Sequence, residues 1–527
     1  MTHLLSPRPA GLRVRRPSLI DVELDPDQRR AVGRPHGGAM LVLGEAGHGK
    51  TTVALHRLAH LYKTARGRFR AAVVVPHEGL ARLLQPLVTR LGADVRVSTY
   101  DAWARRQARR AFGDLPRREA ESTPPGARRV KRDPALRALL AELARRPPGR
   151  IDDDEDAPPP KTKAHAHRGD LQHLFGDRAL VERLARASRQ GIGAYAVEQT
   201  LEHTRVQFSA TGEEAYAHVI DRERLVPADA RSLDAGTPAE DAGTVDAEDY
   251  AVLFELDRLR GERLGRPPTR PRPYDCLVLD EAQELAPLEL ALLGRSLAPG
   301  GTLVVAGDAD QQTDPAACFE GWAATMAELG APDPERVVLN VGYRCPPAVV
   351  ALARALREGR RPDRPPPLAR FDDGAALVAW VADEARRLER LDEAASLAVV
   401  TRSPLLARRL AAGLRGLVPC RLVLDGEFVP HRGVDVTLVE QVKGLEFDAV
   451  VIADADAASY PDEPASRRAL YVAITRARHS FALACVGAPS PLLAAGGEAP
   501  PPAGPAPGAP NAGARTSFYA RGAPTLP

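Results

Sequence analysis

The chain has 527 residues, which is enough for two or three domains that each bury a core. Its 72 basic and 69 acidic side chains give a formal net charge of +3, so total charge predicts no polyanionic partner and any basic surface must be local. Five scattered cysteines without a CxxC pair argue against zinc, iron–sulfur and disulfide sites, and no apolar run approaches the roughly 18 residues of a membrane span, so we expect a soluble cytoplasmic protein.

Lysine is rare in this chain. Only six of the 72 basic residues are lysines, and the others are arginines. A lysine ammonium is a compact point charge, unlike the planar guanidinium of arginine. We therefore expect the few lysines to lie where the chemistry needs such a charge. They are Lys50, Lys63, Lys131, Lys161, Lys163 and Lys443.

The first motif along the chain is a phosphate-binding loop. The stretch GEAGHGKT fits the pattern G-x-x-x-x-G-K-[ST], with the apolar run MLVL before it and a helical pattern, VALHRLAHLY, after it. The glycines let main-chain N–H groups point at phosphates, Lys50 reaches the β- and γ-phosphates, and Thr51 ligates Mg²⁺. The alternative is a glycine-rich turn with a chance lysine. The expected nucleotide-binding residues are Gly44, Glu45, Ala46, Gly47, His48, Gly49, Lys50, Thr51 and Thr52.

Short apolar runs recur along the chain and alternate with helical patterns. Strands that are apolar on both faces and alternate with helices indicate parallel sheets covered on both sides. The sequence therefore predicts an α/β fold. The predicted strands are residues 40–43, 71–75, 276–279, 302–306, 396–400, 436–439, 449–453 and 481–486.

The strand pattern lapses between about residues 104 and 270. Arg105, Arg106, Arg109 and Arg110 recur at helical spacing at its start, which predicts either a basic nucleic-acid face or a merely solvated helix. Prolines, arginine pairs and the acidic run DDDED predict a mobile or disordered insertion over 116–168, and helices follow over 169–224. The proline- and glycine-rich tail, 496–527, is expected to be disordered.

A second strand supplies the carboxylates that a phosphate loop requires. In YDCLVLDEAQEL, four apolar residues lead into Asp280 and Glu281, which places both at the carboxyl edge of the sheet. Asp280 is expected to hold Mg²⁺, and Glu281 to accept a proton from the water that attacks the γ-phosphate or to orient that water. Strands that end in Asp-Glu also arise by chance, so this interpretation depends on the phosphate loop.

With both motifs in hand, the chain resembles the superfamily 1 helicases of the UvrD/Rep type. Further motifs of that family follow in order. They are LDPDQRRAV (24–32, Q motif), VSTYDAW (97–103, motif Ib), VAGDADQQ (305–312, motif III), LNVGYRCP (339–346, motif IV), VEQVKGLEFDAVVI (439–452, motif V) and LYVAITRAR (470–478, motif VI). Each stretch taken alone also has a simpler interpretation, such as a surface arginine, a turn or a core tyrosine.

The resemblance implies a role for single residues. Gln28 is implied to read the adenine, Tyr343 to stack on the base and Glu446 to contact the ribose. Arg344 and Arg476 are implied to reach the γ-phosphate, Arg476 as the arginine finger, with Gln311 of motif III among the catalytic residues. Thr99 is the implied strand contact. The neighbouring Tyr100 and Trp103 are candidates for stacking on nucleic-acid bases, with core packing as the alternative.

The finer resemblance is to the HelD-like, helicase-IV-like branch. Stretches such as LAPLELALLGRSL and KGLEFDAVVI are similar to that branch, some of whose members act on RNA polymerase. We expect the branch's long N-terminal coiled-coil arm to be absent, since Gln28 comes early. The short spacing between Arg344 and Lys443 likewise predicts that the accessory domain usual in UvrD-type enzymes is small or missing.

The resemblance implies two RecA-like domains that close on ATP and Mg²⁺. The expected divisions are 1–115 and 249–338 for the first domain, 116–248 for its helical and partly disordered insertion, 339–495 for the second domain and 496–527 for the tail. The leading function is an ATP-dependent single-stranded DNA translocase or helicase, monomeric, with 3′→5′ polarity implied by the resemblance. The alternatives are an ATPase that acts on RNA polymerase, and an ATP-binding switch without unwinding.

Overall fold

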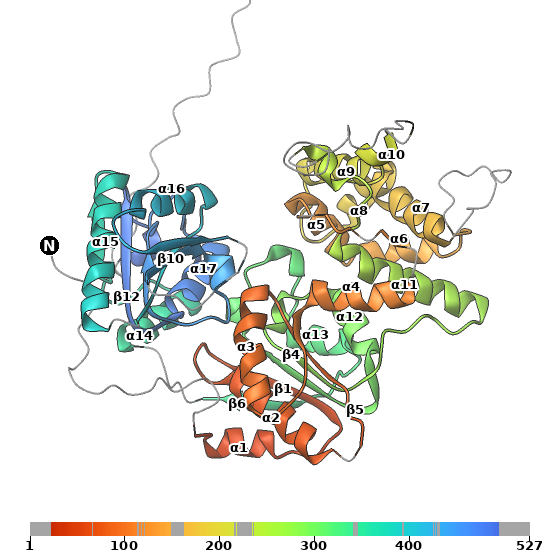
Figure 1. Ribbon diagram of the computed structural model, residues 1–527, viewed down its shortest axis with the longest axis horizontal. Coiled ribbons are helices and arrows are strands. Elements are labelled where there is room, and N and C mark those ends of the chain that lie inside the picture. Colours follow the sequence, from red (N-terminus) through yellow and green to blue (C-terminus); the bar gives the residue numbers. More distant parts are fainter. Residues whose placement is uncertain are drawn as a thin grey trace, which may run out of the picture.

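Parallel strands form the core of both halves of the chain. The structure, a computed structural model, describes residues 23–494 except 66, 113–114, 117, 121, 149–162, 216–217, 219–233, 235–236, 341–345, 393–394, 425, 427 and 429–432. Within the described residues two six-stranded sheets form, and every neighbouring pair of strands is parallel. The predicted α/β class with two RecA-like domains is confirmed (Figure 1).

The first sheet has the strand order β3-β2-β4-β5-β1-β6. Its strands are β1 (Gly38–Gly44), β2 (Ala71–Val75), β3 (Val97–Thr99), β4 (Tyr274–Leu279), β5 (Leu297–Gly307) and β6 (Glu335–Leu339). Because side chains alternate along a strand, Val73 packs with one set of helices and Val74 with the other. The first set is α1 (Pro26–Val32), α2 (Lys50–Thr64) and α3 (Glu78–Arg90); the second is α4 (Tyr100–Ala111), α11 (Ala247–Leu264), α12 (Pro287–Arg295) and α13 (Trp322–Glu328).

The second sheet has the order β7-β12-β11-β8-β10-β9. Its strands are β7 (Leu368–Phe371), β8 (Ser396–Thr401), β9 (Cys420–Val423), β10 (Gly433–Leu438), β11 (Phe447–Ile452) and β12 (Ala477–Val486). Helices α14 (Pro347–Arg357) and α17 (Pro464–Ile474) cover one face, and α15 (Gly374–Leu391) and α16 (Pro404–Leu414) cover the other. The described residues between α14 and β10 thus all belong to this domain, as the predicted lack of a large accessory domain requires.

A helical unit interrupts the first domain between α4 and α11. It contains α5 (Pro125–Arg132), α6 (Leu136–Leu143), α7 (Lys163–Gly176), α8 (Arg178–Ala187), α9 (Ala194–Gln207), α10 (Gly212–Ala215) and η2 (Pro238–Asp241). The expectation of disorder over 116–168 is wrong for α5 and α6, because Val130, Leu136 and Leu140 are fully buried there. The acidic run at 152–156 and the tail at 496–527 lie outside the described residues.

Short 3₁₀ turns carry several of the motifs. They are η3 (Ala282–Glu284), η4 (Ala309–Gln311), η5 (Pro315–Ala317), η6 (Val439–Val442) and η7 (Pro491–Leu493). Both η3 and η4 follow carboxyl ends of first-sheet strands, and α17 of the second domain packs on η4. In the part of the chain that the structure describes, no helix combines the length and the apolarity needed to cross a membrane.

Candidate ATP site

The phosphate loop joins β1 to α2. Gly47 and Gly49 have φ angles of 78° and 85°, a left-handed conformation that favours glycine. A Cβ atom on Gly49 would also lie 2.8 Å from the Gln28 side-chain nitrogen, so Gln28 would have to shift to admit one. The main chain of the loop therefore leads into the start of α2, where the helix N–H groups and the helix dipole favour binding of an anion.

Lys50 lies over this loop. Its ammonium group donates to the carbonyl oxygens of Gly44 at 2.8 Å and Glu45 at 3.1 Å. The Asp308 carboxylate, at the end of β5, lies 4.0 Å away. Lys50 is only 6% exposed, so its charge acts inside the site with little screening by water.

The residues predicted to hold Mg²⁺ are adjacent. The Thr51 hydroxyl donates to Asp280 Oδ2 at 2.7 Å, and Asp280 Oδ1 is buried without a hydrogen-bond partner among the described residues. Burial and the neighbouring Glu281 raise the pKa of Asp280 to about 7, although the Thr51 hydrogen bond and the charge of Lys50 oppose the rise. An orphaned carboxylate oxygen beside a hydroxyl fits a hard divalent cation, which at such sites takes few protein ligands and several phosphate and water oxygens.

Glu281 sits in an uncommon backbone conformation. Its φ is 55°, one of two positive values among described non-glycine residues, and its side chain accepts from the Gln283 amide at 2.6 Å. The Gln283 side-chain oxygen, Oε1, accepts from the Asp308 main-chain N–H at 3.3 Å. The turn after β4 is thereby joined to motif III, and the second carboxylate is held at the same sheet edge as the phosphate loop.

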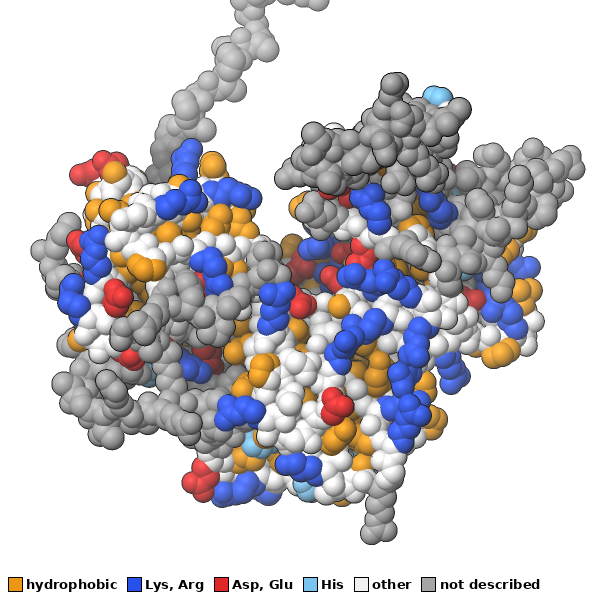
Figure 2. All heavy atoms as spheres, viewed as in Figure 1, with side chains coloured by type: hydrophobic (Ala, Val, Ile, Leu, Met, Phe, Trp, Pro, Cys, Tyr) orange, Lys and Arg blue, Asp and Glu red, His pale blue; other side chains and the backbone are white. Residues whose placement is uncertain are grey.

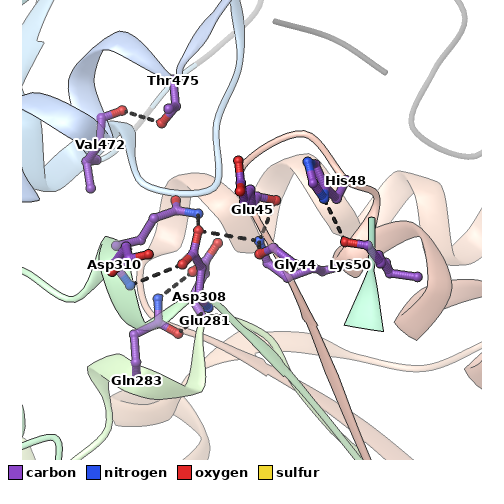
Figure 3. A network of polar contacts seen from close by, with 12 residues as sticks. Gly44, Glu45, His48, Lys50, Glu281, Gln283, Asp308, Asp310, Val472 and Thr475 are labelled. Carbon is purple, nitrogen blue, oxygen red and sulfur yellow. Dashed lines mark hydrogen bonds and ion pairs between the residues drawn. The ribbon is translucent and has the colours of Figure 1, made fainter. Parts of the chain in front are cut away.

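Motif III connects the two domains. Gln311 donates from its amide to Asp308 Oδ2 at 2.8 Å and accepts from the Arg476 guanidinium of the second domain at 2.5 Å. The Tyr471 hydroxyl, from α17, donates to the same Asp308 oxygen at 3.2 Å. Figure 3 shows the surroundings of Asp308, with Gly44, Glu45 and Lys50 of the phosphate loop and Gln283 close to it, and with Val472 and Thr475 of the second domain above.

Arg476 is buried at the domain boundary and is 4% exposed. Its Nε donates to the Val472 carbonyl at 3.0 Å and its Nη1 to the Leu445 carbonyl at 3.4 Å, so motifs V and VI fix the guanidinium from behind. The group contacts Gln311 directly, and through Gln311 it reaches Asp308 and Lys50. Two side chains, Gln311 and Asp308, thus separate this guanidinium from Lys50 at the phosphate loop.

Other predicted nucleotide contacts are engaged within the protein. The Gln28 amide donates to the His48 carbonyl at 3.3 Å, and its oxygen accepts from the Asp25 main chain at 3.2 Å. The His48 ring lies 2.7 Å from the Leu339 carbonyl at the end of β6. Glu446 pairs with Arg478 at 2.8 Å. Tyr343 and Arg344 lie outside the described residues.

The predicted nucleic-acid contacts are differently placed. Thr99 is the N-cap of α4, and its hydroxyl accepts from the Ala102 main chain at 3.2 Å. Tyr100 is 4% exposed and Trp103 is fully buried, and both belong to the core under α4. This burial favours the core alternative, because neither ring is available to stack on a base.

Three residues at the boundary between the domains were not among the predicted site residues. Lys443 of motif V pairs with Glu284 of η3 at 2.9 Å, and the His77 ring lies 2.5 Å from the Lys443 carbonyl. Only the scarcity of lysine pointed to Lys443. No sequence signal marked Glu284 or His77, because their roles arise from the docking of one domain on the other.

Comparisons with known proteins fit this arrangement. The sequence model of a family described as an AAA domain matches residues 28–316, more than half of the chain. The model of the UvrD-like helicase C-terminal domain matches residues 433–484. The first match spans the phosphate loop, Asp280, Glu281 and Gln311, whereas the second contains Lys443, Tyr471 and Arg476.

One matching solved structure is the C-terminal domain of a possible DNA helicase from Lactobacillus plantarum WCFS1. It is 25% identical, covers 30% of this chain and 94% of its own, and superposes with a TM-score of 0.26, too low to bear on the fold. No curated protein matches the chain. From the two family matches and the site that they enclose, the chain belongs to the UvrD/Rep-type superfamily 1 helicases.

Proposed function

We propose that the protein is an ATP-dependent translocase or helicase on single-stranded DNA, with the 3′→5′ polarity that its resemblance implies. The observation that carries this proposal is the contact of Arg476, from the second domain, with Gln311 beside the phosphate loop of the first. A motor of this kind requires that one nucleotide act on both domains at once. The arrangement supports such coupling because Gln311 also contacts Asp308, which faces Lys50.

The side chains present can divide the work of hydrolysis among them. Lys50 and the loop amides bind the phosphates, while Thr51 and Asp280 would hold Mg²⁺, whose charge would stabilise the phosphate oxygens. Glu281 orients the attacking water or accepts its proton. Arg476 neutralises the charge that develops on the γ-phosphate. Loss of phosphate removes that attraction, and the domains can then separate.

The proposal is tested by ATPase assays with single-stranded DNA, RNA or core RNA polymerase, alongside strand-displacement and translocation assays of both polarities. We expect strong stimulation by DNA. Polymerase binding without DNA stimulation would favour the HelD-like alternative. A rate unchanged by all three additions would favour a nucleotide switch and contradict the proposal.

The arginine finger has its own test. Arg476→Ala should lower kcat by about 10³- to 10⁵-fold, because the transition-state charge loses its partner, while ATP affinity changes far less. Arg467→Ala, in the helix α17 that ends just before Arg476, is the matched control, because Arg467 pairs with the half-exposed Asp462. Near-normal turnover of Arg476→Ala, measured by phosphate release with equilibrium nucleotide binding alongside, would refute the assignment.

A further inference from the structure

The amino ends of the first sheet's strands carry a second charged surface, opposite the edge that holds the ATP site. Arg70 comes directly before β2, Arg96 directly before β3, and Arg272 two residues before β4. These three strands are adjacent and parallel, with β2 between β3 and β4. Their leading arginines therefore lie at one edge of the sheet.

Hydrogen bonds join the end of α4 to this edge. The Arg272 main chain donates to Gln107 Oε1 at 2.9 Å, and the Gln107 amide donates to the Tyr274 hydroxyl at 3.1 Å. Arg106 donates to the Ser98 hydroxyl of β3 at 2.8 Å. We define the basic edge as the half-buried Arg70, Arg106 and Arg272 together with four exposed arginines. The four are Arg68, Arg96, Arg110 and Arg270.

Positive charge on the basic edge is only weakly compensated. The Arg70 guanidinium lies 4.0 Å from Asp275, whereas Arg105, one turn away on α4, is taken by Glu119 at 2.7 Å and is therefore left out of the surface. Burial lowers the pKa of Arg106, and the positive charges of Arg96 and Arg105 lower it further. Because the net charge of the whole chain is only +3, the arginines of the basic edge are a local concentration of positive charge. Figure 2 shows Lys and Arg side chains gathered over α4 and along the adjoining side of the first sheet.

The aromatic rings near the basic edge are committed to packing within the protein. Phe69 meets His36 and Tyr62 edge-on, with ring centroids 5.9 and 6.1 Å apart, and the Tyr274 hydroxyl is bonded to Gln107. A surface that binds single strands needs free ring faces on which bases stack. This one offers guanidinium groups, whose planar forks match phosphate oxygens. That chemistry suits a duplex, whose bases are stacked inside and whose phosphates are outside.

We propose that the basic edge binds the phosphate backbone of duplex DNA, independently of base sequence and separately from the ATP site. This surface goes beyond the proposed motor activity, because it would anchor the protein beside a duplex whether or not ATP is turned over.

The test compares two variants of equal charge change. Arg68, Arg96 and Arg270 are changed together to Gln in one, and the exposed Arg390, Arg408 and Arg409 of the second domain are changed to Gln in the control. Binding of a blunt DNA duplex is measured by fluorescence anisotropy across a salt series. Each lost phosphate contact should reduce the slope of log K against log salt by about 0.9, so the basic-edge variant should lose up to about 2.7 and bind more weakly.

Single-strand-stimulated ATPase activity is measured in the same preparations. We expect it to stay at the wild-type level in both variants, because the basic edge is remote from the nucleotide. If the basic-edge variant and the control bind the duplex with the same affinity and the same salt slope, the inference is overturned. That holds even if the basic edge instead proves to bind an acidic protein. A wild-type ATPase that DNA fails to stimulate would count against the motor proposal alone.

Discussion

Three of the six lysines are buried and face carboxylates. Lys50, Lys131 and Lys443 are 6%, 2% and 7% exposed, and they face Asp308, the pair Asp246 and Asp249, and Glu284 respectively. A buried ammonium is costly unless it is paired and hydrogen-bonded. The expectation that the rare lysines serve as compact charges therefore holds at these positions, one in each part of the molecule.

Lys131 allows a direct test of such a charge. It bonds Asp246 at 2.6 Å and Asp249 at 2.7 Å, joining α5 to the start of α11, and His203 of α9 reaches Asp246 at 3.0 Å. Lys131→Met would leave two buried carboxylates facing each other and should cost about 3–5 kcal/mol of stability. Thermal unfolding measures this loss of stability, and hydrogen exchange measures it locally in α5, α9 and α11. The exposed Lys63→Met is the control, and an equal effect of both variants would contradict the argument.

His77 predicts a pH effect at the domain boundary. Its Nδ1 accepts from the Leu80 main chain at 3.2 Å, so the ring must be neutral with hydrogen on Nε2, which then donates to the Lys443 carbonyl. Burial lowers the pKa of His77, and the charge of Lys443 acts in the same direction. The unfolded chain therefore takes up the proton first, so stability from His77 is present above about pH 6.5 and is lost as pH falls.

The measurement for His77 is the melting temperature between about pH 8 and 5 for the wild type and His77→Asn, since Asn can cap α3 but does not titrate. The melting temperature of the wild type should fall more on acidification than that of His77→Asn, so the two melting curves against pH converge at low pH. Parallel curves would show that His77 does not titrate in this range.

At the scale of elements, the interior strands could be predicted and the edge strands could not. The eight predicted apolar runs correspond to β1, β2, β4, β5, β8, β10, β11 and β12, the interior strands of both sheets. The four that sequence analysis missed, β3, β6, β7 and β9, are the four edges. An interior strand is covered on both faces and is apolar throughout. An edge strand such as β6, ERVVL, is largely exposed, and its sequence mixes charged and apolar residues.

The candidate site divides in a similar way. Residues inside one motif, such as Lys50 and Asp280, could be placed from local pattern, because the strand, the loop and the helix that position them are contiguous. Tyr100 and Trp103 were offered as base contacts, although with Ala104, Gln107 and Ala108 they form the buried stripe of an amphipathic helix. Contacts such as that of Tyr471 with Asp308 depend on the docking of two domains, which local pattern does not encode.

Helix α17 brings Tyr471 against the phosphate loop. Its hydroxyl contacts Asp308 and the Ala46 main chain, and burial raises its pKa, so it stays protonated. A phosphate bound by the loop competes for the same main-chain group. Tyr471→Phe should therefore tighten ATP binding several-fold, which corresponds to about 1 kcal/mol for one hydrogen bond. Tyr460→Phe is the control, because it removes a buried hydroxyl that has no hydrogen-bond partner among the described residues. Unchanged or weaker nucleotide affinity in Tyr471→Phe, measured by titration calorimetry, would contradict this competition.

At the scale of the whole molecule, three parts of the chain meet at Glu284. Its carboxylate pairs with Lys443 of the second domain at 2.9 Å and accepts from the Thr313 main chain, after motif III, at 3.1 Å. Its carbonyl accepts from Arg132 of the helical unit at 3.0 Å. Burial raises the pKa of Glu284, and the charge of Lys443 is the largest influence that opposes this rise. A change at this residue can therefore be felt by both domains and by the insertion.

This convergence makes a prediction about coupling. Glu284→Gln and Lys443→Met should each reduce the stimulation of ATPase activity by DNA while leaving basal hydrolysis closer to normal, because neither side chain contacts the phosphate loop. The double variant should be no worse than either single variant, since both break the same contact. The exposed pair Arg178 and Glu198 provides the control, because exposed ion pairs contribute little. If the two losses of stimulation instead add in the double variant, Glu284 and Lys443 act separately, and their ion pair is not the contact that couples the domains.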